Sequence, residues 1–172
     1  KVQFIENSQT ILEPAAGYAV GEWNHWALVR SGSTVTIFKD GASLGTGTLS
    51  GATGSATATL SLGSYYSADL YAFEGRMADA RVSRVARYTA AFTRPAGRLA
   101  PDADTVLLVR VSSGGVIVDA AESPKTITDD PPYPVCTDGA DAVCIDSVAT
   151  APMSAQVAYL SVAGSADFAF AG

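Results

Sequence analysis

The sequence holds few of the residues on which metal, disulfide and nucleic-acid chemistry depends. Its 172 residues include 2 cysteines and 1 histidine, and 17 Asp and Glu outnumber 11 Lys and Arg. Two cysteines are too few for a disulfide scaffold or a structural zinc site. The net charge of −6 argues against a nucleic-acid binder, which needs a basic stripe to displace counterions.

Long apolar runs are also missing. No stretch approaches the ~18 consecutive apolar residues of a membrane span, and no signal-peptide pattern opens the chain. The chain begins with Lys1 rather than Met, so we expect a processed product or a fragment. The hydrophobic content of 48% excludes wholesale disorder. We therefore expect a globular protein with no membrane insertion and no nucleic-acid partner.

The dominant hydrophobic period is two, which is typical of half-buried strands. β-like character opens the chain at 2–4 and 10–12, and strands are predicted at 23–30, 34–39, 57–62, 73–82, 105–111, 116–120 and 156–162. The run at 105–111 (TVLLVRV) is apolar enough to be buried on both faces. No segment supports a long amphipathic helix. Many short strands at roughly 8–12-residue spacing predict an all-β sandwich.

Turn residues separate these strands. Asp40-Gly41 is the strongest hairpin signal, because both central positions of a type I′ turn need a positive φ. The Gly/Thr-rich stretch 45–54 predicts a flexible connection, and 84–94 an irregular segment that Pro95 closes. The prolines between residues 122 and 134 exclude a continuous strand there.

The run WNHWALVRSGSTVTIFKDG (23–41) resembles a hallmark of concanavalin A-like, laminin-G-type jelly rolls. The run FEGRMADARVSRVARYTAAFTRP (73–95) is similar to the closing strand and tail of that family, in versions found in bacteriophage tail, fibre and other virion proteins. The resemblance implies an all-β jelly-roll β-sandwich of the concanavalin A-like lectin/glucanase, laminin-G type.

The resemblance also implies an unusual domain organisation. Residues 1–100 look like the back half of one laminin-G-like unit, and residues 101–172 look like the front half of a second or permuted unit, with a Pro/Asp-rich loop at 122–146. Three explanations are open: a piece of a tandem array, an omitted central segment, or a permuted domain. We favour a fragment of a tandem array. In each case, unpaired sheet edges must be covered within the chain or by a neighbouring subunit.

Catalytic signals are weak. The family's hydrolases carry their acid pair as E-x-D-x-x-E, on alternate residues of one strand. No such run is present, and Glu74 and Asp79 are five residues apart, on opposite faces of a regular strand. His25 is the only histidine and would be required by any Ser-His-Asp or Cys-His site. We interpret it as a packed structural histidine and expect no enzyme activity.

Aromatic residues offer the candidate binding sites. Tyr65, Tyr66, Asp69 and Tyr71 lie in a predicted rim loop, where tyrosines can stack on a sugar ring and a carboxylate can accept hydroxyl hydrogen bonds. The alternatives are an anchored loop or a subunit contact. Trp23 and Trp26 could form a sugar platform, but a spacing of three puts them on opposite strand faces. We therefore expect core packing for at least one of them.

The acidic second half offers two further candidates. Cys136 and Cys144 flank a short loop and could close a disulfide in an oxidising setting, worth ~2–3 kcal/mol by chain-entropy reasoning. Asp138, Asp141 and Asp146 cluster nearby, but their spacing is not that of an EF-hand loop. We interpret the cluster as a solvated acidic loop, with Ca²⁺ as the alternative and no other cofactor expected.

Charge and resemblance together predict assembly. Six arginines gather in one stretch: Arg76, Arg81, Arg84, Arg87, Arg94 and Arg98. They either form local ion pairs or meet the acidic 119–146 segment of the next copy. We expect a non-catalytic structural or adhesion module at a virion surface or outside the cell, whose partners are copies of itself, other virion proteins and host-surface carbohydrate. The alternative is a carbohydrate-binding lectin domain of a secreted or phage protein.

Overall fold

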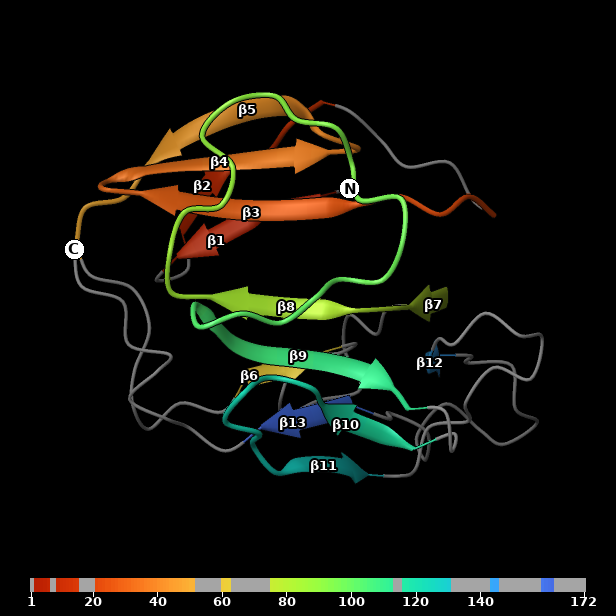
Figure 1. Cartoon of the computed structure of the whole chain (residues 1–172). Coiled ribbons are helices and arrows are strands. Elements are labelled where there is room, and N and C mark those ends of the chain that lie inside the picture. Colours follow the sequence, from red (N-terminus) through yellow and green to blue (C-terminus); the bar gives the residue numbers. More distant parts are fainter. Residues whose placement is uncertain are drawn as a thin grey trace, which may run out of the picture. The chain divides into compact units, whose positions relative to one another are not determined.

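The computed structural model describes residues 2–6, 9–15, 21–51, 60–62, 75–112, 116–130, 143–145 and 159–162. These residues form thirteen strands and irregular segments, with no helix among them (Figure 1). The chain divides into two compact units. Unit 1 comprises residues 1–53, 85–98 and 170–172, and unit 2 comprises residues 54–84 and 99–169. Neither unit is continuous in sequence. The prediction that residues 1–100 and 101–172 resemble the back and front halves of two family units is not tested by this division into compact units.

Unit 1 is built around a three-stranded antiparallel sheet in the order β3-β4-β5. Its strands are β3 (Trp26–Ser31), β4 (Thr34–Lys39) and β5 (Ala42–Thr48). The predicted strand at 34–39 is confirmed residue for residue. The strand predicted at 23–30 begins later, at Trp26, so the segment before it lies outside the sheet.

A two-residue turn joins β4 to β5, because Lys39 pairs with Ala42. Asp40 and Gly41 have φ values of 50° and 87°, which confirms the positive φ expected at both positions of a type I′ turn. Gly41 also lies against the chain elsewhere. A Cβ added there would sit 1.7 Å from the Phe92 carbonyl oxygen, and the Phe92 N–H donates to the Gly41 carbonyl. At position 41 of this turn, only glycine therefore fits.

The flexible connection predicted at 45–54 is wrong in its first part, because β5 continues to Thr48. Two glycines of this stretch lie within β5, where the lack of a side chain permits a bulge and a close contact. Gly45 (φ 148°) lies next to a shift in the β4–β5 register, as in a bulge. A Cβ at Gly47 would sit 2.7 Å from the Ile11 carbonyl oxygen. The missing side chain lets a second hairpin approach β5, formed by β1 (Phe4–Glu6) and β2 (Gln9–Leu12).

An aromatic cluster covers the opposite face of the unit 1 sheet. Phe38, which is 2% exposed, meets Tyr88 and Phe92 edge-on, and those two rings stack with centroids 3.6 Å apart. Tyr88 and Phe92 belong to segment 85–98, which has no strand or helix. The predicted irregular segment is therefore confirmed. It is fixed by its aromatic side chains rather than by a backbone ladder.

Unit 2 has its core on β9 (Thr105–Val111), the middle strand of a sheet with β8 (Ala80–Ser83) and β10 (Ile117–Asp119). Residues 105–109 and Val111 are buried, and Leu107 and Leu108 are both fully buried although they point to opposite faces. The predicted strand buried on both faces is confirmed. Around it pack aliphatic side chains from other strands: Leu60, Leu62, Met77, Val82, Ile117 and Ile127.

The remaining strands of unit 2 are short. β11 (Ile127–Asp130), β13 (Tyr159–Val162) and β6 (Leu60–Leu62) form a sheet in the order β11-β13-β6, and β7 (Gly75–Met77) pairs with β12 (Val143–Ile145). The continuous strand predicted at 73–82 is wrong, because β7 and β8 are separated at Asp79. This residue has a φ of 48°, a conformation that Asp tolerates and that interrupts a strand.

Candidate functional site

The predicted rim-loop site lies outside the described residues. Tyr65, Tyr66, Asp69 and Tyr71 all belong to that part of the chain, and so do Cys136 and the acidic cluster Asp138, Asp141 and Asp146. Cys144 lies on β12. The glycan contact, the disulfide and the calcium alternative therefore stay predictions.

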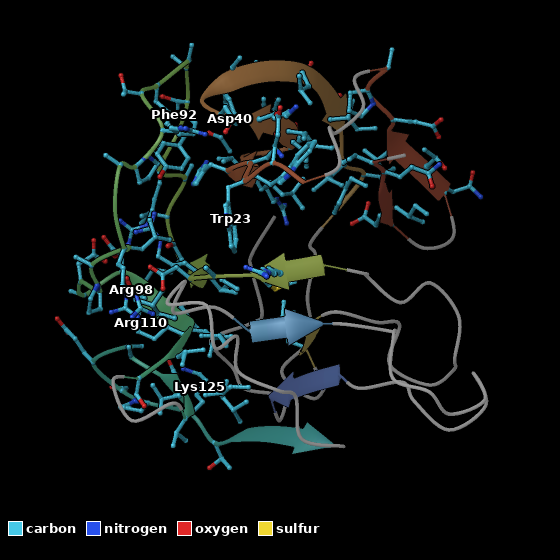
Figure 2. All side chains as sticks on the ribbon, turned by 90° about the vertical axis from the view of Figure 1, so that its right-hand side faces the viewer. Trp23, Asp40, Phe92, Arg98, Arg110 and Lys125 are labelled. Atoms are coloured by element: carbon cyan, nitrogen blue, oxygen red, sulfur yellow. The ribbon has the colours of Figure 1, made fainter. Side chains whose placement is uncertain are left out.

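The expectation of a buried tryptophan is wrong. Trp23 is 51% exposed and Trp26 is 36% exposed. Strand alternation does not apply to Trp23, because the sheet begins only at Trp26, and in Figure 2 the Trp23 side chain extends away from the β3-β4-β5 sheet. Both indoles lie at the end of the sheet that carries the Asp40–Gly41 turn, since Trp26 pairs with Lys39.

A continuous exposed surface follows β3. Leu28, two residues beyond Trp26 and therefore on the same strand face, is 55% exposed. The Lys39 ammonium lies 6.0 Å from the centroid of the Trp26 ring, within the range of a cation–π contact. We call Trp26, Leu28 and Lys39 the β3 surface. Sequence reasoning missed it, although the alternation of Trp26 and Leu28 against Ala27 and Val29 was a signal.

His25 is a structural residue, as expected. Its ring meets those of Tyr88 and Phe92 edge-on, with centroids 6.0 and 5.6 Å away. Its backbone N–H donates to the Asp40 carboxylate, and its carbonyl accepts from the Asp40 N–H. His25 thus fixes the start of β3 against the hairpin turn.

The Asp40 carboxylate is the electrostatic centre of that turn. It accepts the His25 N–H at 2.9 Å and lies 3.2 Å from the Arg94 guanidinium, which also donates to the Trp23 carbonyl. The hydrogen bond from the His25 N–H is the largest cause that lowers the pKa of Asp40. Burial acts in the opposite direction, but Arg94 and Lys39 add to the lowering, and the pKa lies below its ordinary value. Arg94, one of the six clustered arginines, therefore forms a local ion pair, which was the first of the two roles predicted for them. Figure 2 shows Asp40, Trp23 and Phe92 in this region.

Two partly or fully buried carboxylates of unit 2, Asp79 and Asp119, accept hydrogen bonds from the chain's own backbone. Asp79 accepts the Leu99 N–H at 2.7 Å and lies 3.6 Å from Arg110 Nε. The buried Asp119 accepts N–H bonds from Leu108, Ala121 and Lys125. Glu74, which was predicted to lie on the opposite strand face from Asp79, lies outside the described residues. The hydrogen bonds of Asp79 and Asp119 thus hold loop backbone in place.

Within the described ranges, no group of His, Cys, Asp and Glu side chains could hold a metal ion. No helix in the same ranges is long and apolar enough to cross a membrane.

Comparison with known proteins identifies the fold family. The model of the laminin-G-type "Concanavalin A-like lectin/glucanases superfamily" matches residues 3–91, which is 89 of the 172 residues. No curated protein and no solved structure matches the chain significantly. The matched region contains the β3-β4-β5 sheet and the start of the aromatic segment. With its antiparallel strands, the chain has the all-β jelly-roll β-sandwich fold class, and it belongs to the concanavalin A-like lectin/glucanases superfamily.

Proposed function

We propose that this chain is a non-catalytic adhesion and assembly module of a virion, that of a bacteriophage, exposed at the virion surface. It acts through contacts with copies of itself or with other virion proteins. The observation that carries the proposal is the β3 surface, where large apolar side chains stay exposed. Large apolar and aromatic side chains that gather on an exposed surface are typical of interaction sites. The virion setting is supported by the resemblance of residues 73–95 to tail and fibre proteins.

A non-catalytic role is supported by what the described carboxylates do. Asp79 and Asp119 bind backbone N–H groups, whereas a glycoside hydrolase needs two carboxyl groups that face each other across a cleft. His25 is likewise occupied by packing against Tyr88 and Phe92.

The test of this proposal is the assembly state of the native material, measured by intact mass spectrometry and particle imaging. We expect the chain, or a longer protein that contains it, in an ordered multi-copy particle. A soluble species of 17.6 kDa outside any particle contradicts the virion role.

A second function is favoured by the two exposed indoles. Trp23 and Trp26 offer flat apolar faces of the kind that stack on sugar rings, with Lys39 beside one of them. A lectin of this type binds host-surface carbohydrate through these faces and the predicted Tyr65–Tyr71 loop. On a glycan array, Trp23→Ala should weaken binding about tenfold, the effect of roughly 1.4 kcal/mol, which is the upper range for an aromatic contact. Val116→Ala, at a 59% exposed site in unit 2, is the matched control and should leave binding unchanged.

A further inference from the structure

The two edges of the unit 1 sheet differ in protection. On β5, the bulge near Gly45 breaks up the outer edge, and the β1–β2 hairpin packs closely against the sheet face at Gly47. β3 forms the other edge, and among the described residues it pairs only with β4. Its six residues, WALVRS, contain no Pro or Gly, and its register with β4 runs without a shift. Exposed edges of this kind readily pair with another strand.

The side chains along β3 decide which strand fits. Trp26, Leu28 and Arg30 alternate along one face of the strand. The guanidinium of Arg30 is held at the far end by the carbonyls of Gly32 and Gly51, at 2.8 and 3.1 Å. An aromatic ring therefore lies at one end of this face, a cation at the other, and an exposed leucine between them.

The order Trp26, Leu28, Arg30 matches the same order on a second copy that runs in the opposite direction. If a second β3 runs antiparallel to the first with the two Leu28 residues opposite, Trp26 of each copy faces Arg30 of the other. Directly opposed side chains have Cβ atoms about 4.5–5.5 Å apart, which suits a leucine pair at the centre and a cation–π contact at each end. On the other face, Ala27 meets Val29. Each indole then lies between its own Lys39 and Arg30 of the second copy.

We propose that β3 is a dimerisation strand, which pairs antiparallel with β3 of a second copy about a two-fold axis at Leu28. The inference rests on the proposed assembly function and names its partner. A two-fold interface uses one patch on both subunits, and the Trp26–Leu28–Arg30 order meets that requirement with a single register. The pairing extends each three-stranded sheet of unit 1 across the axis and gives β3 a second neighbour, which the described residues do not supply.

The experiment is sedimentation equilibrium of the full chain over a range of concentrations. We expect a reversible dimer with twice the chain mass of 17.6 kDa. Leu28→Lys puts two like charges opposite each other at the axis and should raise the dimer dissociation constant at least tenfold. Ile5→Lys is the matched control, because Ile5 is 53% exposed in the same unit, and it should leave the dimer intact.

Two substitutions that exchange the aromatic residue and the cation test the register of the pairing. Trp26→Arg and Arg30→Trp should each weaken the dimer, and the double variant should restore it, because the aromatic and the cation exchange places. Circular dichroism and melting curves of each variant verify its folding. A wild-type monomer at all concentrations overturns the proposal, as does a dimer equally sensitive to Leu28→Lys and Ile5→Lys, or a failure of the double variant to restore pairing.

The two proposals fail separately. A monomeric chain that still occurs in virion particles overturns β3 pairing and leaves the adhesion role standing. A dimer that depends on Leu28 but occurs outside any particle supports β3 pairing and contradicts the virion role.

Discussion

Both units have a three-stranded antiparallel sheet with a well-buried middle strand, but they bury that strand differently. In unit 1, β4 is covered on one face by the rings of Tyr88 and Phe92 from an irregular segment. In unit 2, aliphatic side chains from short strands surround β9, and Leu107 and Leu108 are fully buried. The edge strand β3 of unit 1 stays partly exposed on the face that carries Trp26 and Leu28. The middle strand β9 of unit 2 is almost wholly enclosed.

Each unit also uses an aspartate to fix the chain beside its middle strand. Asp119 in unit 2 is 7% exposed and binds three backbone N–H groups. Asp40 in unit 1 has a side chain that is 34% exposed and relies on one backbone N–H and the Arg94 guanidinium. In both units an aspartate carboxylate accepts backbone N–H hydrogen bonds, in an enclosed site in unit 2 and in a more exposed site in unit 1. We expect removal to cost much more in the enclosed site, because unsatisfied N–H groups there lose access to water.

Asp119→Ala should have the largest effect. It leaves three N–H groups near β9 without their acceptor, and we expect a loss of about 3–5 kcal/mol in the free energy of unfolding. Amide exchange of β9 and β10 should accelerate strongly, as measured by hydrogen–deuterium exchange. Glu122→Ala, at a nearby exposed carboxylate, should change neither quantity. An equally small effect of the two substitutions would contradict a stabilising role for the enclosed Asp119 carboxylate.

Gly41→Ala is the corresponding change in unit 1 and should come second. The φ of 87° and the Phe92 carbonyl 1.7 Å from the new Cβ force the turn and segment 85–98 apart, at a cost of about 2–3 kcal/mol. Both tryptophans belong to unit 1, so their fluorescence reports its unfolding. Gly51→Ala, where nothing lies within 4 Å of the new Cβ, is the control. Equal melting temperatures for the two variants would contradict the close packing at Gly41.

Asp40→Asn should have the smallest effect and should depend on pH. Asparagine also tolerates positive φ, so the turn stays and only the charge is lost. Because the pKa of Asp40 is lowered on folding, its charge stabilises the fold above the unfolded-state value of 3.8, and this stabilisation disappears as the pH falls through the lower folded-state pKa. At pH 7 we expect a cost within about 1 kcal/mol, as for exposed ion pairs.

The measurement is the melting temperature of wild type and Asp40→Asn between pH 7 and pH 2. The two curves should converge at the acid end. In an Arg94→Gln background, the effect of Asp40→Asn should shrink, because the pair is already broken. A difference between the curves that is constant with pH counts against the electrostatic explanation.

Local sequence patterns predicted the parts of the fold that depend on local physics. The strand at 34–39 and its Asp40–Gly41 turn follow from alternation and from the positive φ that this dipeptide accepts. The buried strand at 105–111 follows from its unbroken apolar run. The family assignment rests on the runs 23–41 and 73–95, the first of which contains the strand at 34–39 and its turn, and the family match over residues 3–91 confirms the superfamily.

What the sequence could not supply are contacts between distant residues. Asp79 interrupts a predicted strand because its carboxylate holds the Leu99 N–H, 20 residues away. Gly47 reads as a flexible position, yet it is glycine because Ile11 lies against it. The exposure of Trp26 and Leu28 depends on which strand lies at the sheet edge, and the period of a single strand does not reveal that.

The interleaved order of the two units has a consequence for recombination and protein engineering. Segment 85–98 completes unit 1 but is encoded between 54–84 and 99–169, which both belong to unit 2. A crossover within 54–84, or a truncation at residue 84, would separate the rings of Tyr88 and Phe92 from the strand that they cover. A cassette that grafts the unit 1 sheet onto another protein with its aromatic cover must therefore extend to segment 85–98, and it carries residues 54–84 of unit 2 with it.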